Sequence, residues 1–131
     1  MVSDPIGDLI IRLTNAGAIK KPSVSVPFSN FKQAIAEKLV AVGYVKAIEK
    51  KGKKVKKTLD IVLNYDADGK HKIQGVKRIS KPGRRMYKSV LDITPVRYGF
   101  GALILSTPKG IMTDKECKRE KVGGEALFEI W

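Results

Sequence analysis

The stretch that decides the fold runs from Tyr98 to Trp131 and reads YGFGALILSTPKGIMTDKECKREKVGGEALFEIW. Its centre is the apolar run of residues 102–105, which stops at the polar sequence STPKG. A short apolar run between glycines and a Pro-Lys-Gly turn is typical of a buried strand that ends in a tight loop. The run therefore predicts a strand with the hydroxyl groups of Ser106 and Thr107 at the rim of a rigid core.

A short helix and a further strand are predicted after this loop. Thr113 and Glu116 have the spacing of a capping box, which opens a helix. Gly123 and Gly124 are expected to close that helix, and residues 125–131 then alternate as a strand. The hydroxyl loop, the helix start and the two glycines should consequently lie near one another.

The residues before this stretch predict two helices and a small sheet. Asp4 and Pro5 open the first helix, whose apolar stripe ends by residue 17. Ser29 caps the second helix and Gly43 ends it. The expected buried face of the second helix consists of Phe31, Ile35, Leu39 and Val42.

The predicted fold class is α+β with two halves. Residues 1–79 form an N-terminal α/β domain, with two helices on a small sheet that includes strands at 23–27, 44–49 and 59–64. Residues 80–131 form a β-rich C-terminal half with one short helix, packed against the first.

Charge indicates the class of partner. The chain has 26 Lys and Arg against 13 Asp and Glu, a net charge of +13, and such a field attracts polyanions. Nucleic acid is the leading partner class, ahead of anionic membranes or heparin-like polymers. A single cysteine cannot form an internal disulfide, which favours a reducing compartment. No apolar stretch approaches a membrane span, and the N-terminus is unlike a signal peptide.

Catalytic and metal sites are not predicted. One histidine, His71, and one cysteine, Cys117, supply neither a zinc site nor a Cys-His pair. No complete dinucleotide fingerprint or P-loop is present, so neither a cofactor nor a small-molecule substrate is expected. His71 is interpreted as an exposed polar residue and Cys117 as a packed thiol. A small hydrolase that uses Ser106 and His71 remains a rival hypothesis.

Four segments, in order along the whole chain, resemble the bacterial form of the eighth protein of the small ribosomal subunit. They are DPIGD at residues 4–8 with Arg12 and Asn15, ISKPGRRMY at 79–87, LSTPKGIMTD at 105–114 and GGE at 123–125. The chain departs from the family pattern at Pro108, where serine is common. Any RNA contact that relatives make at that position is therefore in doubt here.

The resemblance implies a primary binder of the central domain of small-subunit ribosomal RNA. Such a protein works in the cytoplasmic ribosome, is needed for subunit assembly and lies beside other small-subunit proteins. Many members of this family also repress translation of their own operon messenger RNA. A charge-only binder of nucleic acid or of anionic surfaces is the alternative, and competition with transfer RNA at physiological salt would separate the two.

Structured RNA offers phosphates, 2′-hydroxyls and splayed bases, and each candidate residue suits one of these groups. Small hydroxyls can read a 2′-hydroxyl or a base edge, glycines permit close approach, arginine and lysine contact phosphate, and tyrosine can stack on a base. Glu125 is expected to brace the hydroxyl loop or to accept from a base edge. The lysines between Lys46 and Lys57 should attract RNA without selectivity. The predicted RNA-binding residues are Lys32, Arg84, Arg85, Tyr87, Ser106, Thr107, Lys109, Gly123, Gly124 and Glu125. The C-terminal half, residues 80–131, is therefore the expected RNA-binding domain.

Overall fold

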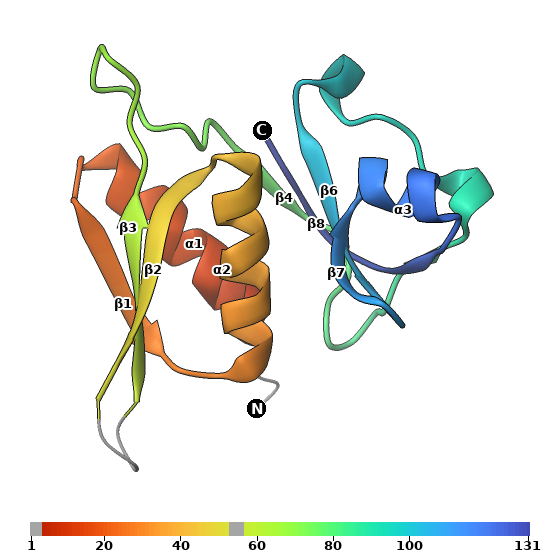
Figure 1. Cartoon of the computed structure of the whole chain (residues 1–131), viewed down its shortest axis with the longest axis horizontal. Coiled ribbons are helices and arrows are strands. Elements are labelled where there is room, and N and C mark those ends of the chain that lie inside the picture. Colours follow the sequence, from red (N-terminus) through yellow and green to blue (C-terminus); the bar gives the residue numbers. More distant parts are fainter. Residues whose placement is uncertain (1–3, 53–56) are drawn as a thin grey trace. The chain divides into compact units, whose positions relative to one another are not determined.

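The computed structural model describes residues 4–52 and 57–131, which form two compact units (Figure 1). One unit lies within residues 5–74, and the other comprises Gly75–Trp131 together with Asp4. The predicted α+β class is confirmed. The predicted domain boundary between residues 79 and 80 stays a prediction. Part of the predicted lysine tract, residues 53–56, lies outside the described residues.

The N-terminal unit has two helices and a three-stranded antiparallel sheet of order β1-β3-β2. Its elements are α1 (Pro5–Ala18), β1 (Ser23–Pro27), α2 (Asn30–Val42), β2 (Val45–Lys51) and β3 (Thr58–Leu63). The predicted apolar stripe of α1, from Ile6 to Leu13, is buried. Residues of β3 alternate between half-buried and buried positions, as expected for a strand with one face on a core.

Helix α2 has the predicted caps but a different buried face. The Ser29 side chain accepts a hydrogen bond from the backbone N–H of Lys32 at 3.1 Å, and Gly43 ends the helix at φ +90°. Phe31 and Val42, predicted to be buried, are each 40% exposed. The buried stripe consists of Lys32, Ile35, Ala36 and Leu39. Because that stripe includes positions 32 and 36, the buried face of the helix is rotated away from Phe31 and Val42.

His71 is not the exposed polar residue that the sequence predicted. Its ring packs 5.4 Å from the ring of Tyr65, and a Cβ atom on Gly17 would lie only 1.7 Å from its Nδ1 atom. The Nε2 atom is buried and has no hydrogen-bond partner among the residues that the structure describes. Burial therefore lowers the pKa of His71, because a charged ring would lose its hydration there.

We expect the protein to lose stability as the pH falls from about 7.5 to about 5.5. The folded state keeps His71 neutral, whereas an unfolded chain takes up a proton near its ordinary pKa of about 6.5, which favours unfolding. Urea unfolding at several pH values measures this effect. Because His71 is the single histidine, His71→Gln should flatten the dependence. An equal slope in that variant would contradict the assignment.

The C-terminal unit is a five-stranded antiparallel sheet with one short helix. Strand β8 pairs with β6 on one side and with β4 and β5 on the other, and β7 pairs with β6. An ion pair of 2.9 Å between Asp4 and Arg78 joins Asp4 to this unit. The elements are β4 (Val76–Arg78), β5 (Tyr87–Lys88), β6 (Ala102–Thr107), β7 (Gly110–Thr113), α3 (Asp114–Glu120) and β8 (Gly124–Ile130), with short 3-10 turns at Val90–Asp92 and Arg97–Gly99.

Helix α3 opens as predicted and ends differently. Thr113 and Glu116 form both hydrogen bonds of a capping box, each 3.2 Å long. The helix ends at Lys121, which adopts a left-handed conformation with φ +58°, so Gly123 and Gly124 are not its terminators. Cys117 is fully buried in the core of this unit, and burial raises the pKa of its thiol.

Candidate nucleic-acid interface

Three strands bring polar side chains from distant parts of the sequence into one row. Tyr87 on β5 pairs with Glu125 on β8, and Glu125 pairs with Ser106 on β6. Directly paired residues of antiparallel strands project from the same face of a sheet. Tyr87, Glu125 and Ser106, here called the polar row, therefore share one face.

A bulge sets the register of this row. Ile104 pairs with Phe128, but Leu105 pairs with Ala126, so Leu127 is an extra residue on β8. Without that extra residue, Ser106 would pair with Ala126 instead of Glu125. Because a shift of one residue moves every following side chain to the other face, the bulge decides which residues of β8 accompany Ser106.

The two predicted hydroxyl groups have different roles in the β6–β7 turn. The Thr107 hydroxyl donates to the carbonyl oxygen of Gly110 at 2.8 Å and accepts from the backbone N–H of Lys109 at 3.1 Å. Thr107 thus stiffens the turn. The half-buried Ser106 hydroxyl makes no hydrogen bond within residues 4–52 and 57–131. Ser106 is the hydroxyl that can reach a ligand.

Glu125 braces a different segment from the one predicted. Its Oε2 atom accepts hydrogen bonds from the hydroxyl of Ser80 at 2.5 Å and from Nη1 of Arg85 at 3.2 Å. Ser80 is fully buried and its oxygen also accepts from the backbone N–H of Met86 at 3.2 Å. These bonds tie the segment before β5 to β8. Ser80, which the sequence reasoning missed as a site residue, is the buried link of this arrangement.

Both glycines of the Gly123–Gly124 pair are required by close contacts within the protein. A Cβ atom on Gly124 would lie 2.2 Å from the carbonyl oxygen of Ser106, and one on Gly123 would lie 2.4 Å from that of Lys88. Both obstacles are backbone atoms, which cannot move without separating neighbouring strands. Any role of the two glycines in close approach to RNA stays a prediction.

Exposed cations flank the polar row. Lys81 and Arg84 exchange backbone hydrogen bonds of 3.0 and 2.9 Å, which close a tight turn and leave the side chain of Arg84 exposed. Lys109 lies 3.5 Å from Glu120 in a solvent-exposed ion pair, which holds the lysine only weakly. Tyr87 is 70% exposed and is not a core residue. The arrangement offers an aromatic face, a hydroxyl and positive charge on one unit.

Lys32 differs from the other predicted site residues. It lies on α2 in the N-terminal unit, and its side chain is buried along the helix. Its Nζ atom donates to the carbonyl oxygen of Pro27 at 3.2 Å. This internal contact occupies one of the three donors of the ammonium group, so Lys32 is less accessible than the cations of the C-terminal unit.

The N-terminal unit contains a second polar concavity, which the sequence reasoning did not assign as a site. It has a volume of about 310 Å³ and lies between α1 and β1. The sequence pattern that could have indicated this concavity is the spacing of Arg12 and Asn15, which are one helical turn apart and lie off the apolar stripe of α1. The polar residues that line it are Arg12, Asn15, Lys21, Ser23 and Ser25.

Within residues 4–52 and 57–131, no three His, Cys, Asp or Glu side chains gather as a metal site would require. The helices of this part of the chain are all too short or too polar to span a bilayer.

Known proteins are similar to this chain over its whole length. A family model described as ribosomal protein S8 matches residues 4–131. Small ribosomal subunit protein uS8 of Mycoplasma mobile is 44% identical over 131 residues, covering 100% of this chain and 98% of the relative. The uS8 proteins of Chloroflexus aurantiacus and Clostridium botulinum are 46% and 42% identical, with at least 98% of each chain covered.

Proposed function

We propose that this chain binds the central domain of small-subunit ribosomal RNA directly. The chain belongs to the ribosomal protein S8 family and is a structural constituent of the small ribosomal subunit. The family is not enzymatic, so the hydrolase hypothesis is dropped. The observation that carries the RNA-binding proposal is the polar row beside a stiffened turn, with exposed cations on the same unit. Each of these features serves a different part of an RNA surface.

In this proposal, uncharged side chains provide selectivity. Ser106 has a hydroxyl that can both donate to and accept from a 2′-hydroxyl or a base edge. Its position is held by the β6–β8 pairing and by the Thr107 bonds within the turn. Tyr87 presents an exposed ring on which an unstacked base can stack. Both contacts require RNA of a particular shape.

Glu125 can lie in such an interface because its charge is compensated within the protein. A free carboxylate facing phosphates would be repelled, but Oε2 of Glu125 already accepts from Arg85 and from Ser80. The carboxylate then orients Arg85 and the segment before β5 toward the same face. Glu125 is therefore a positioning residue, with Arg85 and Tyr87 as the groups that contact RNA.

Exposed cations supply attraction that does not depend on sequence. Arg84 and Lys109 are exposed, and each can contact a phosphate. Lys46, Lys50, Lys51 and Lys57 of the N-terminal unit are exposed as well and add to this field. The same surface would serve early binding during subunit assembly. It would also serve repression of the protein's own operon, if the messenger imitates the ribosomal site.

Replacing Ser106 by alanine is expected to weaken binding to a central-domain RNA fragment roughly 3- to 10-fold, the value of one lost hydrogen bond. The dependence of binding on salt should not change, because no charge is removed. Filter binding at several salt concentrations measures both quantities. The matched control is Ser89→Ala, since Ser89 lies on the same unit and its hydroxyl donates to Asp92 at 2.9 Å.

Competition with transfer RNA tests the proposal against charge-only binding. At about 150 mM salt, excess transfer RNA should leave the wild-type complex with the central-domain fragment largely intact and displace more of the Ser106→Ala complex. Equal displacement of both proteins to completion would favour the non-selective alternative.

A further inference from the structure

The C-terminal unit has a second surface, which lies toward the other end of β6 from the polar row. It is a concavity of about 760 Å³ between the segment of residues 93–99 and the start of α3. Residue 99 precedes β6 by three positions, whereas Ser106 and Thr107 are its last two residues. Asp114, which lines the concavity, bonds to Leu103 near the start of β6, and Ser106 lies three residues or about 10 Å further along the strand, so the concavity is a separate surface from the polar row.

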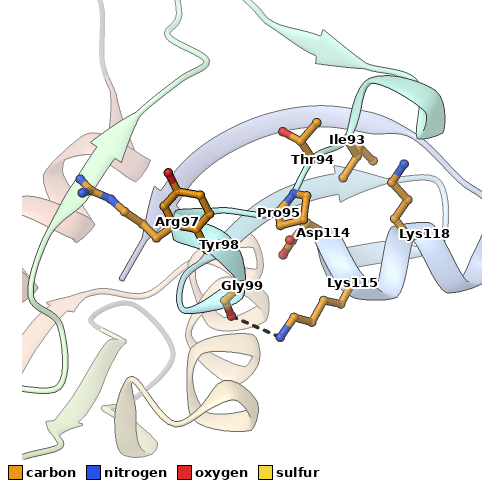
Figure 2. A pocket seen from close by; sticks show the side chains of 9 residues that line it. All are labelled: Ile93, Thr94, Pro95, Arg97, Tyr98, Gly99, Asp114, Lys115 and Lys118. Atoms are coloured by element: carbon orange, nitrogen blue, oxygen red, sulfur yellow. Dashed lines mark hydrogen bonds between the residues drawn. The ribbon is translucent and has the colours of Figure 1, made fainter.

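The walls of this concavity are apolar and its rim is basic. Ile93, Pro95 and Tyr98 contribute apolar surface, and Lys115 and Lys118 extend from α3 along the opposite side (Figure 2). Nζ of Lys115 lies 3.5 Å from the carbonyl oxygen of Gly99.

One carboxylate, that of Asp114, also lines the concavity. It is 3% exposed and accepts a hydrogen bond from the backbone N–H of Leu103 at 3.2 Å. Its carboxylate is thus hydrogen-bonded to the strand, while Lys115 and Lys118 of the rim are exposed residues.

Tyr98 has a strained backbone conformation. Arg97 and Tyr98 have φ values of +51° and +56°, which are unfavourable for residues with a Cβ atom. The turn is held by hydrogen bonds from Gly99 and Gly101 to the carbonyl oxygen of Val96, and Arg97 stacks 4.0 Å over the ring of Trp131. Despite this strain, the Tyr98 side chain is 99% exposed. Strain at an exposed aromatic residue indicates a binding role rather than a contribution to folding.

The segment of residues 91–100, which includes part of the concavity, exposes unusually many large apolar side chains. Of the large hydrophobic side chains that the structure describes, the three most exposed are Leu91, Tyr98 and Phe100, at 87%, 99% and 87%. All three lie within the ten residues that run from Leu91 to Phe100. Several exposed apolar side chains in one short segment, next to a basic rim, are typical of a protein-binding surface.

We propose that this concavity docks an acidic segment of a neighbouring protein. The segment inserts an apolar side chain against Pro95 and Tyr98, and its carboxylates pair with Lys115 and Lys118. Charge complementarity selects an acidic partner. Tyr98 is the single aromatic side chain among the lining residues, and the exposed side chains of Leu91 and Phe100, which are close to it in sequence, suit apolar contacts with a peptide. The volume also exceeds that of one nucleobase. These features favour a peptide over RNA.

Fluorescence anisotropy with a labelled peptide tests this proposal on the full-length protein. The probe has glutamates on both sides of a tryptophan–leucine pair, and it should bind with a Kd on the order of 10–100 µM. Two matched peptides serve as controls, one with glutamine for each glutamate and one with glycine and serine for the apolar pair. Both should bind at least about fivefold more weakly, because one lacks the carboxylates that pair with the lysines and the other lacks the apolar side chains that enter the concavity. Equal binding of all three peptides would overturn the proposal, as would no saturable binding.

Variants of the protein locate the binding. Tyr98→Gly should weaken peptide binding about tenfold or more, while the melting temperature rises because glycine relieves the positive φ. Lys115→Gln combined with Lys118→Gln should weaken binding about fivefold and reduce its dependence on salt. Tyr87→Ala is the control, since it removes an exposed tyrosine of the same unit outside the concavity. Unchanged peptide affinity in Tyr98→Gly would overturn the proposal.

RNA binding by the same variants separates the two surfaces. Tyr98→Gly should bind the central-domain fragment within about twofold of the parent, whereas Tyr87→Ala should bind it more weakly. If Tyr98→Gly instead loses RNA affinity and keeps peptide affinity, the concavity is an RNA surface and the docking proposal is wrong. That result would leave the function proposed for the polar row standing.

Discussion

Replacing Gly124 by alanine is expected to cost about 3 kcal/mol of unfolding free energy and to abolish selective RNA binding. The added Cβ atom would lie 2.2 Å from the carbonyl oxygen and 3.0 Å from the carbonyl carbon of Ser106. Both are backbone atoms of β6, so β6 and β8 would have to separate. Separation breaks the pairing that places Ser106 beside Glu125. Urea unfolding and binding to the central-domain fragment measure the two losses.

Gly83→Ala is the matched control for this substitution. Gly83 also lies in the C-terminal unit, and a Cβ atom there would meet nothing within 4 Å. Its stability should change by no more than about 0.5 kcal/mol. If Gly124→Ala were as stable as Gly83→Ala, the close approach of β6 and β8 at this point would be wrong.

Raising the salt concentration from about 50 to about 200 mM is expected to weaken RNA binding roughly 10³-fold. The physical reason is counterion release, which gives this loss when about six phosphates are neutralised. Exposed cations of the C-terminal unit, among them Lys81, Arg84 and Lys109, together with the lysines of the N-terminal unit, can supply that number. A salt titration of binding to the central-domain fragment gives the slope directly.

Single charge removals should separate attraction from selectivity. Arg84→Gln and Lys109→Gln are each expected to reduce the salt slope by about 1 and to weaken all RNAs alike. Ser106→Ala should leave the slope unchanged, because it removes no charge. If Ser106→Ala flattened the slope and Arg84→Gln did not, the roles assigned to the two kinds of residue would be reversed.

Local signals in the sequence were sufficient for most of the elements. The apolar run at 102–105, the capping box at Thr113 and Glu116 and the cap at Ser29 each depend on residues within a few positions, and each is present in the structure. Periodicity was less reliable where the tertiary environment chooses the face. Phe31 and Val42 fit a helical stripe, but the stripe that is buried includes Lys32 and Ala36 instead.

The sequence by itself determined most of the elements, the cationic character and the position where polar residues end a buried strand, because these depend on composition and short spacing. Only the tertiary structure decided that Glu125 pairs with Ser106 and holds Ser80 and Arg85, and that Thr107 is engaged within the turn. It also decided that residues 93–99 and α3 enclose a concavity. The reason is that strand register is non-local: one extra residue, Leu127, moves the side chains of β8 to the opposite face, and no local pattern marks that bulge.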